Sequence, residues 1–293
     1  MTMAKTRLTE GPVRMFHVKT MSPEDFDFAV QITDKMNWNL TTADFEFMIE
    51  LEPDGCFVLL ENSKRIGLAT TVSFGTIAWF GNLIVNESRR KRGAGSQLVK
   101  HSLEYLRHKR VKTVGLYAYM DRIHFYERLG FKRDSEFTVL NGRGLSLPVK
   151  SVVREAEKQD LQEIIEFDRS CFSASRRKLL EPIILDPDNI CCISAEGKRM
   201  VGYVVAKVYR HMSEIGPLVC RKGREDAAVN LLRPVLSRLQ GYEVSMCVPN
   251  KESTIINFFK TLGFNESFRV ARMFFGSPIA EDCISMVESL ERG

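Results

Sequence analysis

The first half of the chain alternates short apolar runs with segments of helical periodicity. Residues 56–60, 66–74 and 77–85 are apolar runs bounded by polar turns, which is typical of strands. Helices are predicted at 23–36, where serine, proline and two acids open the segment, and at 42–51, 97–107 and 122–129, with further strands at 16–20, 111–118 and from 131 onward. This succession predicts a mixed sheet with helices packed on it, an α+β (mixed α/β) fold.

The second half of the chain repeats the first, because equivalent residues recur at a nearly constant offset. Cys56, Glu61, Gly67 and Gly81 recur 135 positions later as Cys191, Glu196, Gly202 and Gly216, and Phe125, Leu129, Gly130 and Phe131 recur 133 later as Phe258, Leu262, Gly263 and Phe264. So small a drift indicates two copies of one fold. We expect domains at 1–145 and 146–293, joined near 142–150 where glycine and proline cluster, each a mixed, mostly antiparallel sheet flanked by helices.

A basic loop with two glycines lies between the apolar run 77–85 and the helix predicted at 97–107. It reads Arg90-Lys91-Arg92-Gly93-Ala94-Gly95-Ser96. Glycines let the backbone approach a ligand closely, and free amides at a helix start favour anions, so the loop predicts a phosphate or pyrophosphate site. The alternative for its basic residues is a solvated face or a weak nucleic-acid patch. The loop lacks the Gly-Lys-Ser/Thr ending of an ATP or GTP site and the first glycine of a dinucleotide site.

These residues resemble a known family. Residues 81–85, followed by Arg90-x-x-Gly93-x-Gly95, are similar to the acetyl-CoA signature of the GNAT superfamily of N-acetyltransferases, and residues 125–131 are similar to its segment ending in Gly-Phe. The resemblance covers roughly residues 55 to 135. It implies direct transfer of an acetyl group from acetyl-CoA to an amine. It also implies that the pantetheine arm pairs with the backbone around Leu83 and Val85, and that the amide of Leu83 or Ile84 donates to the oxyanion.

The same resemblance places Tyr126 as the acid that protonates the leaving thiolate; the alternative is a tyrosine packed where a helix meets the sheet. No base is identified, since residues 77–85 contain no acid, and water or a distant acid such as Asp44, Glu46 or Asp168 stays open. Trp38 and Asn39 lie at a helix break where the family often builds its acceptor pocket, although a tryptophan there is equally suited to a core. Asp168 and Arg176 either line a cleft between the copies or form an ordinary ion pair.

The second copy differs where the chemistry is expected. Its loop, 220–226, has no Gly-x-Gly, and Glu225 and Asp226 open the following helix, where they would repel a pyrophosphate. Phe259 stands at the position of Tyr126. We therefore expect a degenerate C-terminal domain, whose sequence resembles the YitH type of acetyltransferase-like domain. The predicted function is acetyl transfer to a small primary amine or an amino-acid-like acceptor.

Two rival functions fit parts of the chain: a non-catalytic acyl-CoA sensor and a nucleic-acid binder using residues 89–92. The net charge of +5 is modest and no broad basic face with aromatic residues is evident, so no nucleic-acid partner is expected. No apolar run is long enough to span a membrane, and residues 1–14 lack the apolar core of a secretory signal. Seven cysteines without a Cys-x-x-Cys pair predict reduced, buried thiols in a cytoplasmic protein, without a metal site. The oligomeric state and the acyl chain length stay open.

Overall fold

The first half of the chain forms the elements that its hydrophobic pattern predicts. The computed structural model describes residues 16–148, 152–197, 199–279 and 283–293, so the polar segment 1–14 lies outside the described residues. The elements of this half are β1 (Phe16–Thr20), α1 (Phe26–Asp34), α2 (Thr42–Leu51), β2 (Cys56–Glu61), β3 (Lys64–Phe74), β4 (Ile77–Val85), α3 (Ala94–His108), β5 (Thr113–Tyr119), α4 (Ile123–Glu127) and β6 (Lys132–Arg143).

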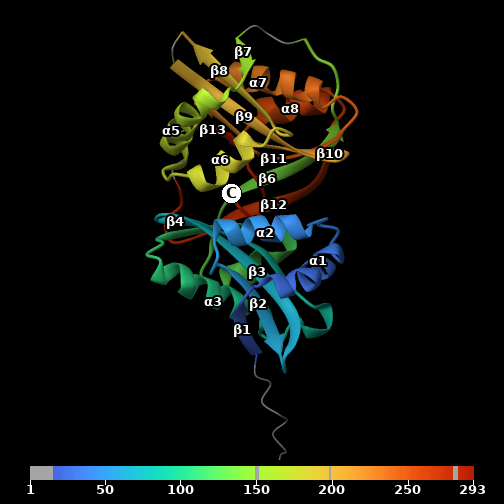
Figure 1. Cartoon of the computed structure of the whole chain (residues 1–293), viewed down its shortest axis with the longest axis vertical. Helices are drawn as coiled ribbons and strands as arrows, with labels where there is room; N and C mark the ends of the chain where they lie inside the picture. Colours follow the sequence, from blue (N-terminus) through green and yellow to red (C-terminus); the bar gives the residue numbers. More distant parts are fainter. Residues whose placement is uncertain (1–15, 149–151, 198, 280–282) are drawn as a thin grey trace, which may run out of the picture.

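The second half follows the same order of strands and helices, as the repeat predicts. Its elements are β7 (Val153–Glu155), α5 (Leu161–Phe172), α6 (Arg177–Leu185), β8 (Ile190–Glu196), β9 (Arg199–Tyr209), β10 (Met212–Arg221), α7 (Glu225–Arg238), β11 (Glu243–Pro249), α8 (Ser253–Thr261), β12 (Asn265–Phe275) and a last strand, β13 (Cys283–Met286). The two halves stack along the long axis of the molecule (Figure 1). The mixed, mostly antiparallel sheet flanked by helices is confirmed.

The two halves share one continuous sheet. In the described residues its strands follow the order β1-β2-β3-β4-β5-β12-β6-β11-β10-β9-β8-β7, with β13 paired to β10. Strand β12 of the second half therefore lies between β5 and β6 of the first, and β6 pairs on its other side with β11. Figure 1 shows β6 and β12 crossing the junction together. Each half completes the sheet of the other, which joins the halves by backbone hydrogen bonds as well as by side chains.

Helix α3 begins at Ala94, three residues before the predicted start. Gly93 caps it with φ 85°, a left-handed conformation that glycine adopts without strain. The Gly93 carbonyl accepts the first helical hydrogen bond from the amide of Gln97, at 3.0 Å. The two-glycine loop thus runs directly into the helix, so the loop and the helix start form one structural unit.

Glu52, a fully buried carboxylate after α2, ties the halves together. It accepts hydrogen bonds from Tyr105 on α3 (2.6 Å), from Lys109 directly after α3, and from Lys178 on α6 of the second half (2.9 Å). Burial by itself raises the pKa of Glu52, but hydrogen bonds from Lys109, Tyr105 and Lys178 outweigh it and lower the pKa to about 2. The carboxylate is therefore charged at every physiological pH.

We expect Glu52→Gln to lower the free energy of unfolding at pH 7 by about 1–2 kcal/mol, because the buried carboxylate loses its charge-assisted hydrogen bonds while the partly exposed ammonium groups of Lys109 and Lys178 are still solvated. The folded-state pKa is depressed, so this stabilisation is present above the ordinary value of 4.5 and is lost as the pH falls toward 2. Urea unfolding at pH 7 and pH 3 should show the gap between wild type and variant narrowing at pH 3. Glu50→Gln, on the exposed side of α2, is the control, and an equal gap at both pH values would contradict the role of Glu52.

The prediction that all cysteines are reduced is wrong. Cys171 on α5 and Cys283 on β13 form a disulfide, with Cα atoms 5.7 Å apart and a sequence separation of 112. The other five cysteines are free and buried. The bond depends on the end of the chain folding back beneath α5, a long-range contact that cysteine spacing does not reveal.

Candidate functional site

Strand β4 has an open edge in the middle of the first half. It pairs with β3 along its length but with β5 only through Ile77, Ala78 and Trp79. Beyond Trp79 the two strands no longer pair, while β5 stays paired with β12 on its other edge up to Tyr119. In the described part of the chain, no strand pairs with this edge of β4 from Phe80 to Val85, which leaves backbone groups available to a ligand.

A bulge at the same place reshapes the backbone of β4. Gly81 is opposite Thr70 and Ile84 is opposite Leu68, so β4 carries one residue more than β3 over this stretch. Asn82 adopts φ 51°, and its side-chain amide donates to the Thr70 hydroxyl at 3.2 Å. Asn82 and Leu83 are half-buried and line a cavity. The bulge thus turns the strand toward the cavity at the residues where the amide donor is predicted.

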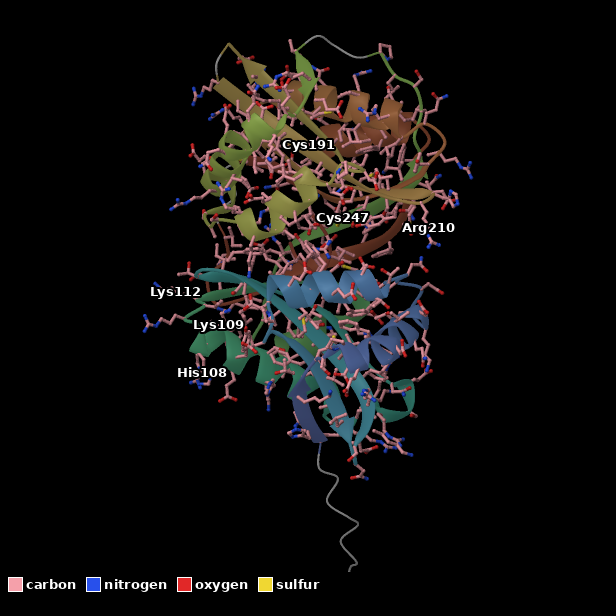
Figure 2. The ribbon with its side chains drawn as sticks, in the orientation of Figure 1. His108, Lys109, Lys112, Cys191, Arg210 and Cys247 are labelled. Carbon is pink, nitrogen blue, oxygen red and sulfur yellow. A yellow bond between two sulfur atoms is a disulfide. The ribbon has the colours of Figure 1, made fainter. Side chains whose placement is uncertain are left out.

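The cavity lies between the halves and has a volume of about 2230 Å³. Its walls include β4 and the basic loop on one side, and the starts of β10 and β11 on the other. Figure 2 shows two of its lining residues, Cys247 inside the junction and Arg210 at the outer edge. Of the predicted residues, those that line the cavity are Trp38, Asn39, Leu83, Ile84, Val85, Arg90, Lys91, Gly93, Gly95, Ser96 and Tyr126.

The basic loop closes one end of the cavity. The amides of Ala94, Gly95 and Ser96 precede the first helical hydrogen bond, so they have no acceptor within α3. Arg90 folds back and donates from Nε to the Val85 carbonyl at 2.9 Å. Arg92 is exposed and does not line the cavity, and the methyl group of Ala94 is buried in the core. The charge of this end therefore comes from the helix start with Arg90 and Lys91.

Tyr126 stands on α4 opposite the open edge of β4. Its ring packs edge-on against Phe125 and Phe131, and the side chain is 9% exposed. Tyr126 lines the cavity, and none of the described residues makes a hydrogen bond to its hydroxyl. Burial raises the pKa of Tyr126 above its ordinary value of 10, and nearby Arg122 opposes this shift only partly. The hydroxyl therefore keeps its proton and remains available as a donor.

Asp168 and Arg176, predicted as substrate residues, do not line the cavity. They form an ion pair of 2.6 Å with both side chains almost fully buried, and Tyr203 donates to the same carboxylate at 2.6 Å. Arg176 also donates to the main-chain oxygen of Gly293 at 2.8 Å. The ordinary ion pair is therefore the alternative that the structure bears out, because a buried charge pair satisfied on all sides has no free group for a substrate.

Trp38 and Asn39 lie in the loop between α1 and α2, at the cavity wall. The indole N–H of Trp38 donates to the Tyr119 hydroxyl at 3.1 Å, which links this loop to the end of β5. Among the distant acids considered as a base, Asp44 lines the cavity but its carboxylate accepts from the amide and hydroxyl of Thr41 at the start of α2. Asp44 is thus engaged in capping its own helix.

The second half fills the position that is open in the first. The offset of 135 makes Leu218, Val219 and Cys220 on β10 the equivalents of Leu83, Ile84 and Val85. These three residues pair with Met286, Ser285 and Ile284 of β13. The amide of Val287 then bonds to the Cys247 carbonyl on β11, at 3.1 Å. The chain's own last strand thus bridges the gap between β10 and β11.

The segment after β13, residues 287–293, continues from the second half into the first. A Cβ added to Gly216 would meet the Val287 carbonyl oxygen at 1.9 Å, and one added to Gly81 would meet the Cα of Glu291 at 2.6 Å. Gly216 on β10 and Gly81 on β4, which are equivalent in the repeat, are therefore two places where this tail lies directly against a strand. Figure 1 shows the chain ending at the junction. Sequence reasoning missed Glu291 at the cavity, because nothing local places the tail there.

No helix among the described residues is long and apolar enough to cross a membrane. The same residues contain no group of three or more histidine, cysteine, aspartate or glutamate side chains that could hold a metal ion.

Comparisons with known proteins agree with this architecture. Residues 23–131 match the acetyltransferase (GNAT) family and residues 164–286 match an acetyltransferase (GNAT) domain. The chain thus belongs to the GNAT superfamily of acyltransferases, with two GNAT domains in tandem. The resemblance of the second domain to the YitH type stays a prediction.

Individual relatives span the whole chain. It is 24% identical to a holothin acyltransferase from Pseudoalteromonas sp. (strain SANK 73390) over 94% of each chain. A candidate acetyltransferase from Pyrococcus horikoshii has the same fold, with a TM-score of 0.81 and 20% identity over 99% of this chain and 100% of that one. A tandem GNAT protein from the clavulanic acid biosynthesis pathway has a TM-score of 0.62 and 13% identity, covering 92% and 99%.

Proposed function

We propose that the N-terminal domain binds acetyl-CoA and transfers its acetyl group to a primary amine of a small molecule. One observation carries this proposal: the open edge of β4, the start of α3 and Tyr126 all face one cavity. A strand edge, an anion site and a proton donor are the groups that a pantetheine arm, a pyrophosphate and a departing thiolate each need.

In this proposal, different residues along the cavity bind the cofactor, position the thioester and donate the proton. Acetyl-CoA supplies a thioester whose carbonyl carbon accepts the amine. The amides of Ala94 to Ser96, with Arg90 and Lys91, hold the pyrophosphate at the helix start. The backbone from Leu83 to Val85 pairs with the pantetheine arm and turns a bimolecular encounter into a local one. The amide of Leu83 or Ile84 donates to the oxyanion, and Tyr126 gives its proton to the sulfur.

The basic run supports a cofactor site better than a nucleic-acid surface. Arg89 forms an ion pair with Glu61 at 2.5 Å, and neither residue lines the cavity, whereas Arg90 lines it and donates to the Val85 carbonyl. The run is therefore split between an ion pair (Arg89), the cavity wall (Arg90 and Lys91) and solvent (Arg92), whereas a nucleic-acid face needs its charges together on the surface.

The acceptor is an amine small enough to enter a cavity bounded by both domains. The relative named holothin acyltransferase makes holothin the first compound to test, beside benzylamine, glucosamine and lysine. We further propose that the C-terminal domain binds no acyl-CoA. Strand β13 occupies its equivalent edge, and Glu225 and Asp226 stand in the first turn of α7.

Isothermal calorimetry of the full chain with acetyl-CoA, paired with a thiol-release assay on the four amines, tests this function. We expect one site per chain, and thiol release with at least one amine. Two sites would contradict the filled edge of the second domain. Binding without thiol release across a wider amine panel would favour an acyl-CoA sensor, and no binding would overturn the proposal.

A further inference from the structure

We propose that Glu291, on the tail of the second half, binds the ammonium group of the acceptor in the first domain's cavity and takes its proton. This role rests on the proposed acetyl transfer. Residues 77–85 contain no acid that could act as the base, and this proposal gives that role to Glu291. The acceptor class that follows is a primary amine that is protonated in solution.

The position of the tail brings Glu291 to the reacting end of the cavity. Its Cα packs directly on Gly81, where a methyl group would come within 2.6 Å. Gly81 precedes Leu83 by two residues, which is about 7 Å along a strand. Glu291 lines the cavity, and its side chain is 18% exposed. The backbone of Glu291 is thus held close to the stretch of β4 whose amide is proposed to donate to the oxyanion.

The described charged groups around the tail include more carboxylates than cations, so Glu291 is not fully neutralised. Lys207 on β9 contacts both Glu214 (2.8 Å) and Glu288 (2.6 Å), and Arg292 bonds Glu288 at 3.0 Å. Arg292 lies 3.5 Å from Glu291, the nearest cation to it. Three carboxylates therefore share two cations, and in the described part of the chain no hydrogen bond reaches Glu291. Its oxygens have acceptor capacity for an ammonium.

The same surroundings suit Glu291 to proton transfer. Burial raises its pKa, Arg292 and Lys207 oppose the rise, and the like charges of Glu214 and Glu288 add to it, with a raised pKa as the result. Tyr119, at the end of β5, is the other titratable group that faces it. A base whose pKa is moved up toward the working pH accepts a proton more effectively.

The proposed step balances within the cavity. The Glu291 carboxylate removes one proton from the acceptor ammonium, and the free lone pair attacks the thioester carbonyl carbon. The new C–N bond forms, the C–S bond breaks, and Tyr126 donates its proton to the departing sulfur. The acceptor nitrogen, which still carries an extra proton after its attack, gives that proton to the Tyr126 phenolate through solvent in the cavity. Glu291 then releases the proton it took to bulk water, leaving an amide and free thiol.

The test compares Glu291→Gln with wild type in thiol release from acetyl-CoA, using whichever of holothin, benzylamine, glucosamine and lysine the wild type acetylates best. We expect kcat to fall about 100-fold, while the acetyl-CoA Kd from calorimetry stays the same. The fall of kcat toward acidic pH in wild type should disappear in the variant, and Glu291→Asp should restore part of the rate. Glu243→Gln, an exposed glutamate at the outer rim of the cavity, is the matched control and should keep wild-type values.

Each other outcome overturns the role. A wild-type kcat and an unchanged acidic limb in Glu291→Gln would show that another group takes the proton. An equal loss in Glu243→Gln would show a general effect of cavity charge. If Glu291→Gln lost acetyl-CoA binding or had a lower melting temperature than wild type, and Glu291→Asp did not restore either, the residue would only hold the tail in place. A wild type that acetylates no amine removes the proposed function itself, and with it this role.

Discussion

Gly93→Glu is expected to abolish measurable acetyl-CoA binding in calorimetry. Gly93 caps α3 with φ 85°, directly before the amides proposed to hold the pyrophosphate. A glutamate there places a negative charge within a few ångströms of two negative phosphates. At about 4 Å and an effective dielectric constant near 20, such a repulsion amounts to roughly 4 kcal/mol, or about 10³ in Kd.

The control for this variant separates charge from backbone strain. Gly75, in the turn between β3 and β4, has φ 71° and, like Gly93, no atom within 4 Å of an added Cβ. Gly75→Glu therefore carries the same change of charge and a similar conformational cost of about 1–2 kcal/mol. It lies at the other end of β4 and should bind acetyl-CoA normally. Equal loss of binding in both variants would place the effect in folding and not in the loop.

Tyr126→Phe is expected to lower kcat about 100-fold without changing the acetyl-CoA Kd. The substitution removes only the hydroxyl of a cavity-lining side chain that makes no hydrogen bond to another described residue, so folding should be unaffected. Because burial holds the pKa of Tyr126 above 10, wild type should keep this acid through pH 10. Steady-state thiol release between pH 6 and 10 measures both points. Unchanged turnover over that range would show that Tyr126 is a packing residue.

Tyr105→Phe should give the opposite pattern. The Tyr105 hydroxyl donates to buried Glu52 at 2.6 Å, and Tyr105 does not line the cavity. Its removal is expected to lower the free energy of unfolding by about 2 kcal/mol, the cost of a hydrogen bond to a charged group, with kcat unchanged. The two tyrosines together separate a catalytic hydroxyl from a structural one.

The tail distinguishes the two domains, which share one fold. In the first, the edge of β4 after the bulge is open; in the second, β13 pairs with the equivalent residues of β10. The disulfide between Cys171 and Cys283 holds the start of that strand to α5. The loop 220–226 and Phe259 predict a degenerate site in the second domain, but they do not predict that β13 pairs with the equivalent edge of β10.

Local features of the fold could be predicted from the sequence. Strand and helix periodicities place β1 to β5, and the recurrence of residues such as Gly81 and Gly216 shows the duplication, because both are properties of neighbouring residues or of a fixed offset. The position of Gly93 and Gly95 at the start of a helix could be predicted for the same reason, and the anion site there stays a prediction. The tryptophan loop at Trp38 was also found, from a break in helical periodicity.

Contacts between distant segments were decided by the tertiary structure alone. The insertion of β12 between β5 and β6, the Cys171–Cys283 bond and the buried pair of Asp168 and Arg176 each join residues whose proximity no local pattern encodes. Glu291 is the clearest case. In the sequence it is one charged residue near the end of the chain, and it becomes a candidate base only because the tail crosses Gly216 and then Gly81. Backbone packing that close is a property of the assembled sheet, so it becomes visible only when both domains are folded together.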